Sequence, residues 1–247
     1  MAPFPATRPS VIRALGADDR ATRDRARETL AATYWKPAYK YVRLRWNASR
    51  EDAEDLTQDF FIHVFDHATL ERYDAGRARF RTFLRTCIDG VVANARRDAS
   101  RVKRGGAITF VPMDFAGAEL ELAGVAPPAD AQVDEFFRRE WVRAVFEQAV
   151  DRLRRECIAE GRERHLALFM RYDVEPMNDG ERPTYARLAR DLDLPETQVT
   201  NFLALVRRRF RHHVLAVLVD LTGNDAEYAE AARDLLGVEA SSRMMAP

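Results

Sequence analysis

The chain has 247 residues, and its 39 Lys and Arg residues balance its 39 Asp and Glu residues. A net charge of zero argues against binding of the whole chain to a polyanion, so a nucleic-acid surface must come from local segregation of charge. Two cysteines on apolar helical arcs, with no long apolar run and no signal sequence, lead us to expect a cytoplasmic protein without a membrane segment. Helical periodicity dominates and strand-like alternation is nearly absent, which predicts an all-α fold.

The first fifty residues predict one or two helices behind a Pro-rich start. Residues 1–10 should be frayed, and residues 10–15 suit a short helix. Residues 18–48 carry an apolar helical series with many aromatic side chains, which suits a core better than a base-stacking platform, and Pro37 should mark a kink or a break. Asn47-Ala48-Ser49 provides a stop and an N-cap for the helix that follows.

Residues 51–71 form a strongly acidic segment. It contains seven acidic residues and no Lys or Arg, which gives a net charge of −7. A helix over residues 51–65 has one apolar arc, formed by Ala53, Leu56, Phe60, Phe61 and Val64. Ile62 falls among the carboxylates on the opposite side. Two interpretations are open: a single exposed Ile on a solvated face, or a docking face with an apolar anchor for a basic partner helix.

Residues 72–104 carry the opposite charge. Ten Lys and Arg residues against three acids give a net charge of +7. A helix from Phe80 onward has an apolar arc, with Arg81 and Arg85 expected away from it. The loop before it combines arginines with Tyr73, which suits phosphate binding and stacking on an unpaired base. A solvated basic helix after an ordinary turn is the alternative.

Periodicity is lost after Gly105-Gly106 and returns near residue 134. The segment between is mainly acidic and contains Pro127-Pro128, so we expect a flexible or extended linker, which could also follow a channel in a partner. A short acidic helix over residues 225–236 should pack on the second domain or bind a regulator. The expected organisation is a helical domain at 10–106, a linker at 107–133, a second helical domain at 134–219 and an extension at 220–247.

Residues 184–215 predict a helix-turn-helix. Thr184 suits an N-cap, Asp193 tolerates the backbone of a tight turn, and Pro195 suits the start of the longer helix. In that helix a narrow apolar arc lies opposite a small polar face with a basic C-terminal half, as in a DNA-reading helix. An αα-hairpin with a basic surface is the alternative.

The motifs Asp52-Ala-Glu-Asp-Leu-Thr-Gln-Asp-Phe-Phe61 and Phe80-Arg-Thr-Phe-Leu84, with the basic residues up to Arg104, resemble region 2 of extracytoplasmic-function sigma factors of the sigma-70 family. The resemblance implies that the acidic helix docks on the clamp helices of core RNA polymerase, through Asp52, Glu54, Asp55, Gln58, Asp59 and Ile62. It also implies that the loop and basic helix melt and hold the promoter minus-ten element. The expected minus-ten residues are Tyr73, Arg77, Arg79, Arg85, Asn94, Arg97, Arg101, Lys103 and Arg104.

Residues 184–199 resemble region 4 of the same family in the spacing of Thr184-Tyr185, Leu188-Ala189, Leu194-Pro195 and Val199. The resemblance implies that this domain reads the minus-thirty-five duplex. The expected contacts are Thr197, Gln198, Thr200, Asn201, Arg207, Arg208 and Arg211. Positions 200, 202 and 205, usually basic in the family, are Thr200, Phe202 and Leu205 here, so we expect weak DNA binding by this domain alone.

The sequence indicates no enzymatic chemistry. His63 and His67 have a metal-compatible spacing but no third ligand, and there is no nucleotide-binding Gly loop, so we expect no metal and no cofactor. Three functions are compatible with the pattern: a sigma factor, a stand-alone helix-turn-helix DNA-binding regulator, and a helical adaptor that makes only protein contacts. The resemblance favours the first, with core RNA polymerase and promoter DNA as partners and an anti-sigma or other regulator as a third candidate.

Overall fold

The computed structural model describes residues 11–97, 111–175, 182–222 and 224–237. Every regular element in these ranges is a helix, as expected of an all-α chain. The chain divides into two compact units, one of Met1–Val145 with Leu218–Pro247 and one of Phe146–Val217, and each is described by itself. This division differs from the expected domains, because the C-terminal extension belongs to the first unit.

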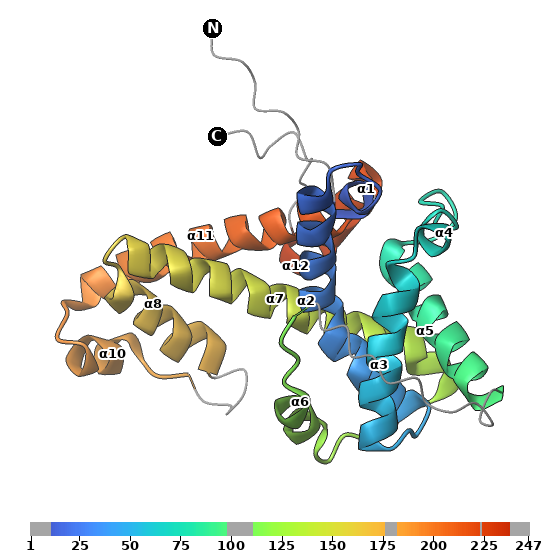
Figure 1. Ribbon diagram of the computed structural model, residues 1–247. Coiled ribbons are helices and arrows are strands. Elements are labelled where there is room, and N and C mark those ends of the chain that lie inside the picture. The colour runs from blue at the N-terminus through green and yellow to red at the C-terminus, as the bar shows by residue number, and fades with distance from the viewer. Residues whose placement is uncertain (1–10, 98–110, 176–181, 223, 238–247) are drawn as a thin grey trace, which may run out of the picture. The chain divides into compact units, whose positions relative to one another are not determined.

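The first unit is built around the long helix α2 (Arg20–Arg45). The unit also contains α1 (Val11–Leu15), α3 (Arg50–Val64), α4 (His67–Leu70) and α5 (Phe80–Arg97), and α3 lies beside α5 (Figure 1). Helix α2 is continuous through the buried Pro37, so the chain does not break there. Ser49 caps α3 as expected, since its side chain accepts the Asp52 N–H at 3.1 Å. The fully buried core includes Leu30, Tyr34, Phe60, Phe61, Phe80 and Leu84.

A short helix occupies part of the segment that was expected to be an extended linker. Helix α6 (Phe115–Leu122) packs on α2, where the Phe115 ring lies 4.9 Å from the Tyr39 ring and 5.6 Å from the Trp35 ring. The Glu119 carboxylate accepts hydrogen bonds from Arg43 Nε at 2.5 Å and Tyr39 Oη at 2.7 Å. The expectation was therefore wrong for these residues, because partners on a distant helix stabilise a segment with no local periodic signal.

The buried face of α5 is wider than its apolar pattern indicates. Arg81 was expected on the wet side, yet it is buried, with its guanidinium carbon 5.1 Å from the centre of the Trp141 ring on α7 (Val133–Ala159). Burial lowers the pKa of Arg81, and the aromatic face offsets part of the lost hydration. The Arg81 prediction was wrong because the side chain finds a ring from a helix some sixty positions away, which helical angles cannot reveal.

The second unit is a set of helices around two apolar clusters. It contains the part of α7 after Val145, α8 (Glu163–Phe169), the π-helical turn η2 (Met170–Val174), α10 (Tyr185–Asp191) and α11 (Glu196–Leu221) up to Val217. Leu168, Leu188, Val199 and Leu203 form one cluster. The last described helix of the chain, α12 (Asp225–Leu236), belongs to the first unit. None of the described helices is long and apolar enough to cross a membrane.

Candidate functional site

Helix α3 presents an acidic face around one apolar side chain. Ile62 is 40% exposed, and Asp55 and Asp59 are exposed on the same side of the helix, with Gln58 half-buried between them. The opposite side is fixed in the core by Ala53, Thr57, Phe60, Phe61 and Val64. The structure thus bears out the expected position of Ile62 among carboxylates. Because the opposite side of α3 is buried in the core, this acidic side faces solvent.

Two of the expected docking acids make contacts inside their own helix. Ser49 Oγ donates a hydrogen bond to the Asp52 carboxylate at 2.8 Å, and Arg50 Nε donates one to Glu54 at 2.9 Å. Asp52 lies in the first turn, where a carboxylate also interacts favourably with the helix dipole. Asp52 and Glu54 therefore stabilise the start of α3, and the outward acidic face centres on the following two turns.

An open groove lies between α3 and α5 next to Ile62. It is lined by Asp59, Ile62, His63 and Asp66 on one side and by Val91, Asn94 and Ala95 on the other. Desolvation, with the nearby Asp55 charge as a second cause, raises the pKa of Asp59. Asn94, expected beside the minus-ten strand, is exposed and lines this groove with the α3 residues. The groove combines apolar side chains with carboxylates, the composition that suits a basic amphipathic partner.

The loop before α5 holds its arginines in different environments. The Gly76 N–H donates to Asp74 Oδ1 at 2.8 Å, which closes a local turn, and Arg77 next to it is 87% exposed. Arg79 is half-buried and forms an ion pair with Glu230 of α12. The Tyr73 ring lies against Phe80 and Phe83, with centroids 5.0 and 5.3 Å apart, and its hydroxyl oxygen is buried. Arg77 forms a local ion pair with Asp74 at 3.3 Å on the surface, and it is the most exposed of these three expected DNA contacts.

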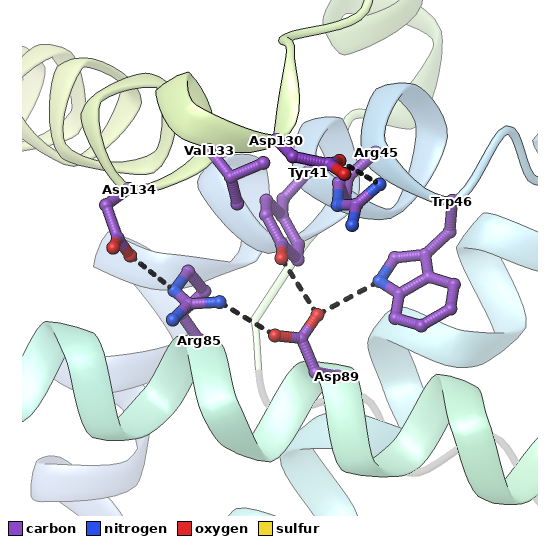
Figure 2. A pocket seen from close by; sticks show the side chains of 8 residues that line it. All are labelled: Tyr41, Arg45, Trp46, Arg85, Asp89, Asp130, Val133 and Asp134. Atoms are coloured by element: carbon purple, nitrogen blue, oxygen red, sulfur yellow. Dashed lines mark hydrogen bonds and ion pairs between the residues drawn. The ribbon is translucent and has the colours of Figure 1, made fainter.

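Arg85 belongs to a polar network in the first unit (Figure 2). Its guanidinium pairs with Asp89 at 2.8 Å and with Asp134 at 2.7 Å, and its side chain is only 20% exposed. Asp89 also accepts hydrogen bonds from Tyr41 Oη at 2.8 Å and Trp46 Nε1 at 3.1 Å, and these groups surround a small pocket. The expected position of Arg85 on the wet face is therefore wrong, because Asp89 of α5 itself and Asp134 of α7 supply partners for its side chain.

The basic end of α5 is exposed as far as the structure describes it. Arg97 is exposed and donates to Asn94 Oδ1 at 2.5 Å. Arg96 is also exposed, and its guanidinium lies 4.9 Å from the Trp46 ring. The expected contacts Arg101, Lys103 and Arg104 lie outside the described residues.

The second unit contains two helices joined by a tight turn. The Thr184 side chain caps α10 by accepting the Arg187 N–H at 3.2 Å, and Asp193 adopts the left-handed conformation with φ 50°, as the sequence predicts for this turn. Leu188 and Ala189 of α10 pack with Val199 and Leu203 of α11. The polar face of α11 is exposed opposite this contact, with Thr197, Gln198, Thr200, Asn201, Arg208 and Arg211.

Arg207 is separate from that exposed face. Its Nε and Nη2 atoms donate to the two carboxylate oxygens of Asp173 at 2.8 and 2.9 Å, and its guanidinium carbon lies 5.2 Å from the Tyr172 ring centre. The Asp173 hydrogen bonds raise the pKa of Arg207. Arg207 was expected to hold a phosphate, but here it ties α11 to the η2 turn.

Comparison with known protein families matches one segment of the first unit. Residues 31–102 match the family model of Sigma-70 region 2, which covers α3, the loop and α5. The chain carries a sigma-70 region 2 domain. Such a domain is part of the sigma-70 family of sigma factors, and the match covers residues 31–102 of this chain. Neither the curated proteins nor the solved structures gave a match.

Sequence reasoning missed the carboxylates that pair with Arg79 and Arg85 and accept the Phe80 N–H in the region 2 domain. Asp89 lies four residues after Arg85, and an i, i+4 pair of opposite charge is a readable signal for their contact. Glu227 and Glu230 gave no such signal, because their partners lie in a different part of the sequence. Among the described residues, no three His, Cys, Asp or Glu side chains lie close enough together to hold a metal ion.

Proposed function

We propose that this chain is an RNA polymerase sigma factor of the extracytoplasmic-function group, which binds core polymerase and directs promoter recognition and transcription initiation in the cytoplasm. The match to region 2 over residues 31–102 carries the proposal. The exposed Ile62, on the same side of α3 as Asp55 and Asp59, supports it, since an apolar anchor with carboxylates around it suits the basic clamp helices of core polymerase.

In this proposal the region 2 domain holds the minus-ten element with the residues that remain suitable. These are Tyr73, Arg77 and Arg79 in the loop and Asn94, Arg97, Arg101, Lys103 and Arg104 toward the basic end. Arg85 is left out because its charge is already balanced by Asp89 and Asp134. Stacking of an unpaired base on one aromatic ring contributes about 1–3 kcal/mol, and the arginines add attraction to phosphates.

The second unit serves in the proposal as region 4, which binds the minus-thirty-five duplex. Support comes from the α10–α11 pair, whose turn at Asp193 and exposed Thr200 and Asn201 suit a helix that enters the major groove. Arg208 and Arg211 are exposed on the same helix and suit phosphates. Because the described part of this face has only two exposed arginines, we expect the domain alone to bind duplex DNA weakly. Tethering to polymerase would then raise its effective concentration at the promoter.

The test is co-purification of the chain with core RNA polymerase, followed by run-off transcription from a promoter library. We expect a stoichiometric complex and transcripts that depend on the added chain. A chain that binds duplex DNA tightly and selectively but does not bind polymerase would be a stand-alone helix-turn-helix regulator. A chain that binds neither DNA nor polymerase would be an adaptor, and both results would refute the proposal.

A further inference from the structure

Helix α12 is attached to the same unit as the loop that precedes α5. The Asn224 side chain caps its start by accepting the Glu227 N–H at 2.8 Å, and Gly237 ends it in the left-handed conformation with φ 64°. Tyr228, Ala231 and Ala232 are buried along one side of the helix. These contacts fix the position of α12, so its acidic side chains meet defined partners.

Glu227 of α12 reaches the first backbone donor of α5. Its carboxylate accepts the Phe80 N–H at 3.0 Å, across 147 positions of sequence, and the side chain is buried. The N-terminus of a helix carries unpaired N–H groups and partial positive charge, which attract phosphates and carboxylates alike. Local caps such as Ser49 on α3 satisfy a helix start without burying a charge. At the start of α5, the Glu227 carboxylate from a distant part of the sequence acts as the cap instead of a local side chain.

Two loop residues with a proposed role in strand binding are covered by the same helix. Arg79 pairs with Glu230, one turn after Glu227 on α12. Tyr73 is half-buried, and burial together with the nearby Glu227 carboxylate raises the pKa of its phenol. A guanidinium, a helix N-terminus and an aromatic ring are the groups that a single strand would require, and each has a group of α12 beside it.

We propose that the acidic side of α12 competes with nucleic acid for the start of α5: the Glu227 and Glu230 carboxylates occupy donors that would otherwise bind phosphates of the minus-ten strand. The inference rests on the proposed function of the loop and adds an autoinhibitory contact to it. Strand binding then requires α12 to move away from Arg79 and Phe80, so the affinity of the free chain for single-stranded DNA is reduced by the free energy of that contact.

The first experiment measures binding of a fluorescently labelled, mixed-sequence single-stranded DNA oligonucleotide to the full chain by anisotropy. Glu230→Arg places two arginines in contact, and we expect about five- to tenfold tighter binding, within the range typical of coupled sites. Asp234→Arg is the matched control, since it makes the same charge change at an exposed position of α12. Equal gains in the two variants would reduce the effect to net charge and overturn the proposal.

A second variant protects the test against misfolding. Glu227→Gln keeps an acceptor for the Phe80 N–H but removes the charge, so α12 should remain folded while oligonucleotide affinity rises about threefold. Unchanged affinity in a folded Glu227→Gln variant, together with no gain in Glu230→Arg, would overturn the inference. Circular dichroism of each variant provides the folding check.

Hydrogen exchange tests the movement itself. We expect the amides of residues 225–236 to lose protection when the oligonucleotide is bound, while those of α2 remain protected. Unchanged or increased protection in α12 would contradict displacement. Arg77→Ala separates the two levels of the argument, because Arg77 binds no group of α12: if this variant leaves oligonucleotide affinity unchanged, the proposed role of the loop fails, whereas a loss in Arg77→Ala with no gain in Glu230→Arg refutes only the competition.

Discussion

The Lys40 ammonium group and the Glu140 carboxylate form a buried ion pair of 2.7 Å that joins α2 to α7 within the first unit. Lys40 is 1% exposed and also binds Glu121 of α6 at 2.6 Å. One buried cation thus links three helices of the unit that contains region 2. Removal of either carboxylate leaves part of that charge without compensation.

We expect Glu140→Ala to lower the free energy of unfolding of the first unit by about 3 kcal/mol, because it leaves a buried ammonium group with one partner. Glu135→Ala is the control, since this exposed carboxylate pairs with Arg138 on the part of the same helix that belongs to the first unit, and the pair should contribute under about 1 kcal/mol. Urea unfolding followed by near-ultraviolet circular dichroism measures both. A Glu140→Ala variant as stable as the control would contradict the role of the pair.

Ile62→Asp should weaken binding to core polymerase at least tenfold, because it places another charge at the centre of the proposed apolar contact. Leu120 of α6 provides a matched control, since it is also an exposed large apolar side chain, at 79%. We expect Leu120→Asp to bind polymerase normally. Pull-down affinities measured at two salt concentrations are the readout, and an equal effect of the two variants would remove Ile62 from the interface.

Neighbouring arginines on α11 should respond differently to truncation. Arg208→Ala should leave the stability unchanged but weaken duplex binding on all sequences and reduce the salt slope by about one unit. Arg207→Ala should instead lower the melting temperature, because Asp173 loses its bidentate partner. Thermal unfolding and salt titration of duplex binding separate the two effects. The reverse assignment, with Arg207 setting the salt slope, would show that the Asp173 pair opens for DNA.

The contact of α6 with α2 should weaken in acid. Hydrogen bonds from Arg43 hold the pKa of Glu119 below its ordinary value of 4.5, so the ionised form is favoured in the folded protein. The stabilisation is complete at neutral pH, begins to fall as pH drops toward 4.5 and is lost below the lowered pKa. Trp35, whose ring contacts Phe115, provides a fluorescence signal for this step. Glu119→Gln should abolish the pH dependence of that signal, and its persistence would assign the transition to another group.

The sequence predicts elements with local signals and fails where distant partners decide. The caps Ser49 and Thr184, and the turn at Asp193, follow from side chains within three residues of the structure they stabilise. Charge by itself does not separate an exposed arginine from one that is held by a distant partner. Arg77 and Arg85 look alike in a basic segment, but only the folded chain brings Asp134 to Arg85.

The same limit explains the linker and the C-terminal extension. Helix α6 is held by contacts with Arg43 and Tyr39, about eighty positions earlier. Its own residues show no helical periodicity, so the sequence did not predict it. The expectation that the acidic helix over residues 225–236 would form was correct, because its apolar spacing is local. Its attachment to the first unit was not predicted, because an amphipathic pattern shows which side of a helix is buried but not which part of the protein that side packs against.

The order in which the ribosome delivers these segments separates the two units in time. Residues 146–217 emerge as one continuous stretch and can close around their own apolar clusters while later residues are still being added. The first unit lacks α12 until residue 236 has left the exit tunnel. During that interval Arg79 and the start of α5 are uncovered in the nascent chain. If α12 competes with nucleic acid as proposed, a stalled or prematurely terminated product that lacks α12 would keep this surface open and would bind nucleic acid more tightly than the complete chain.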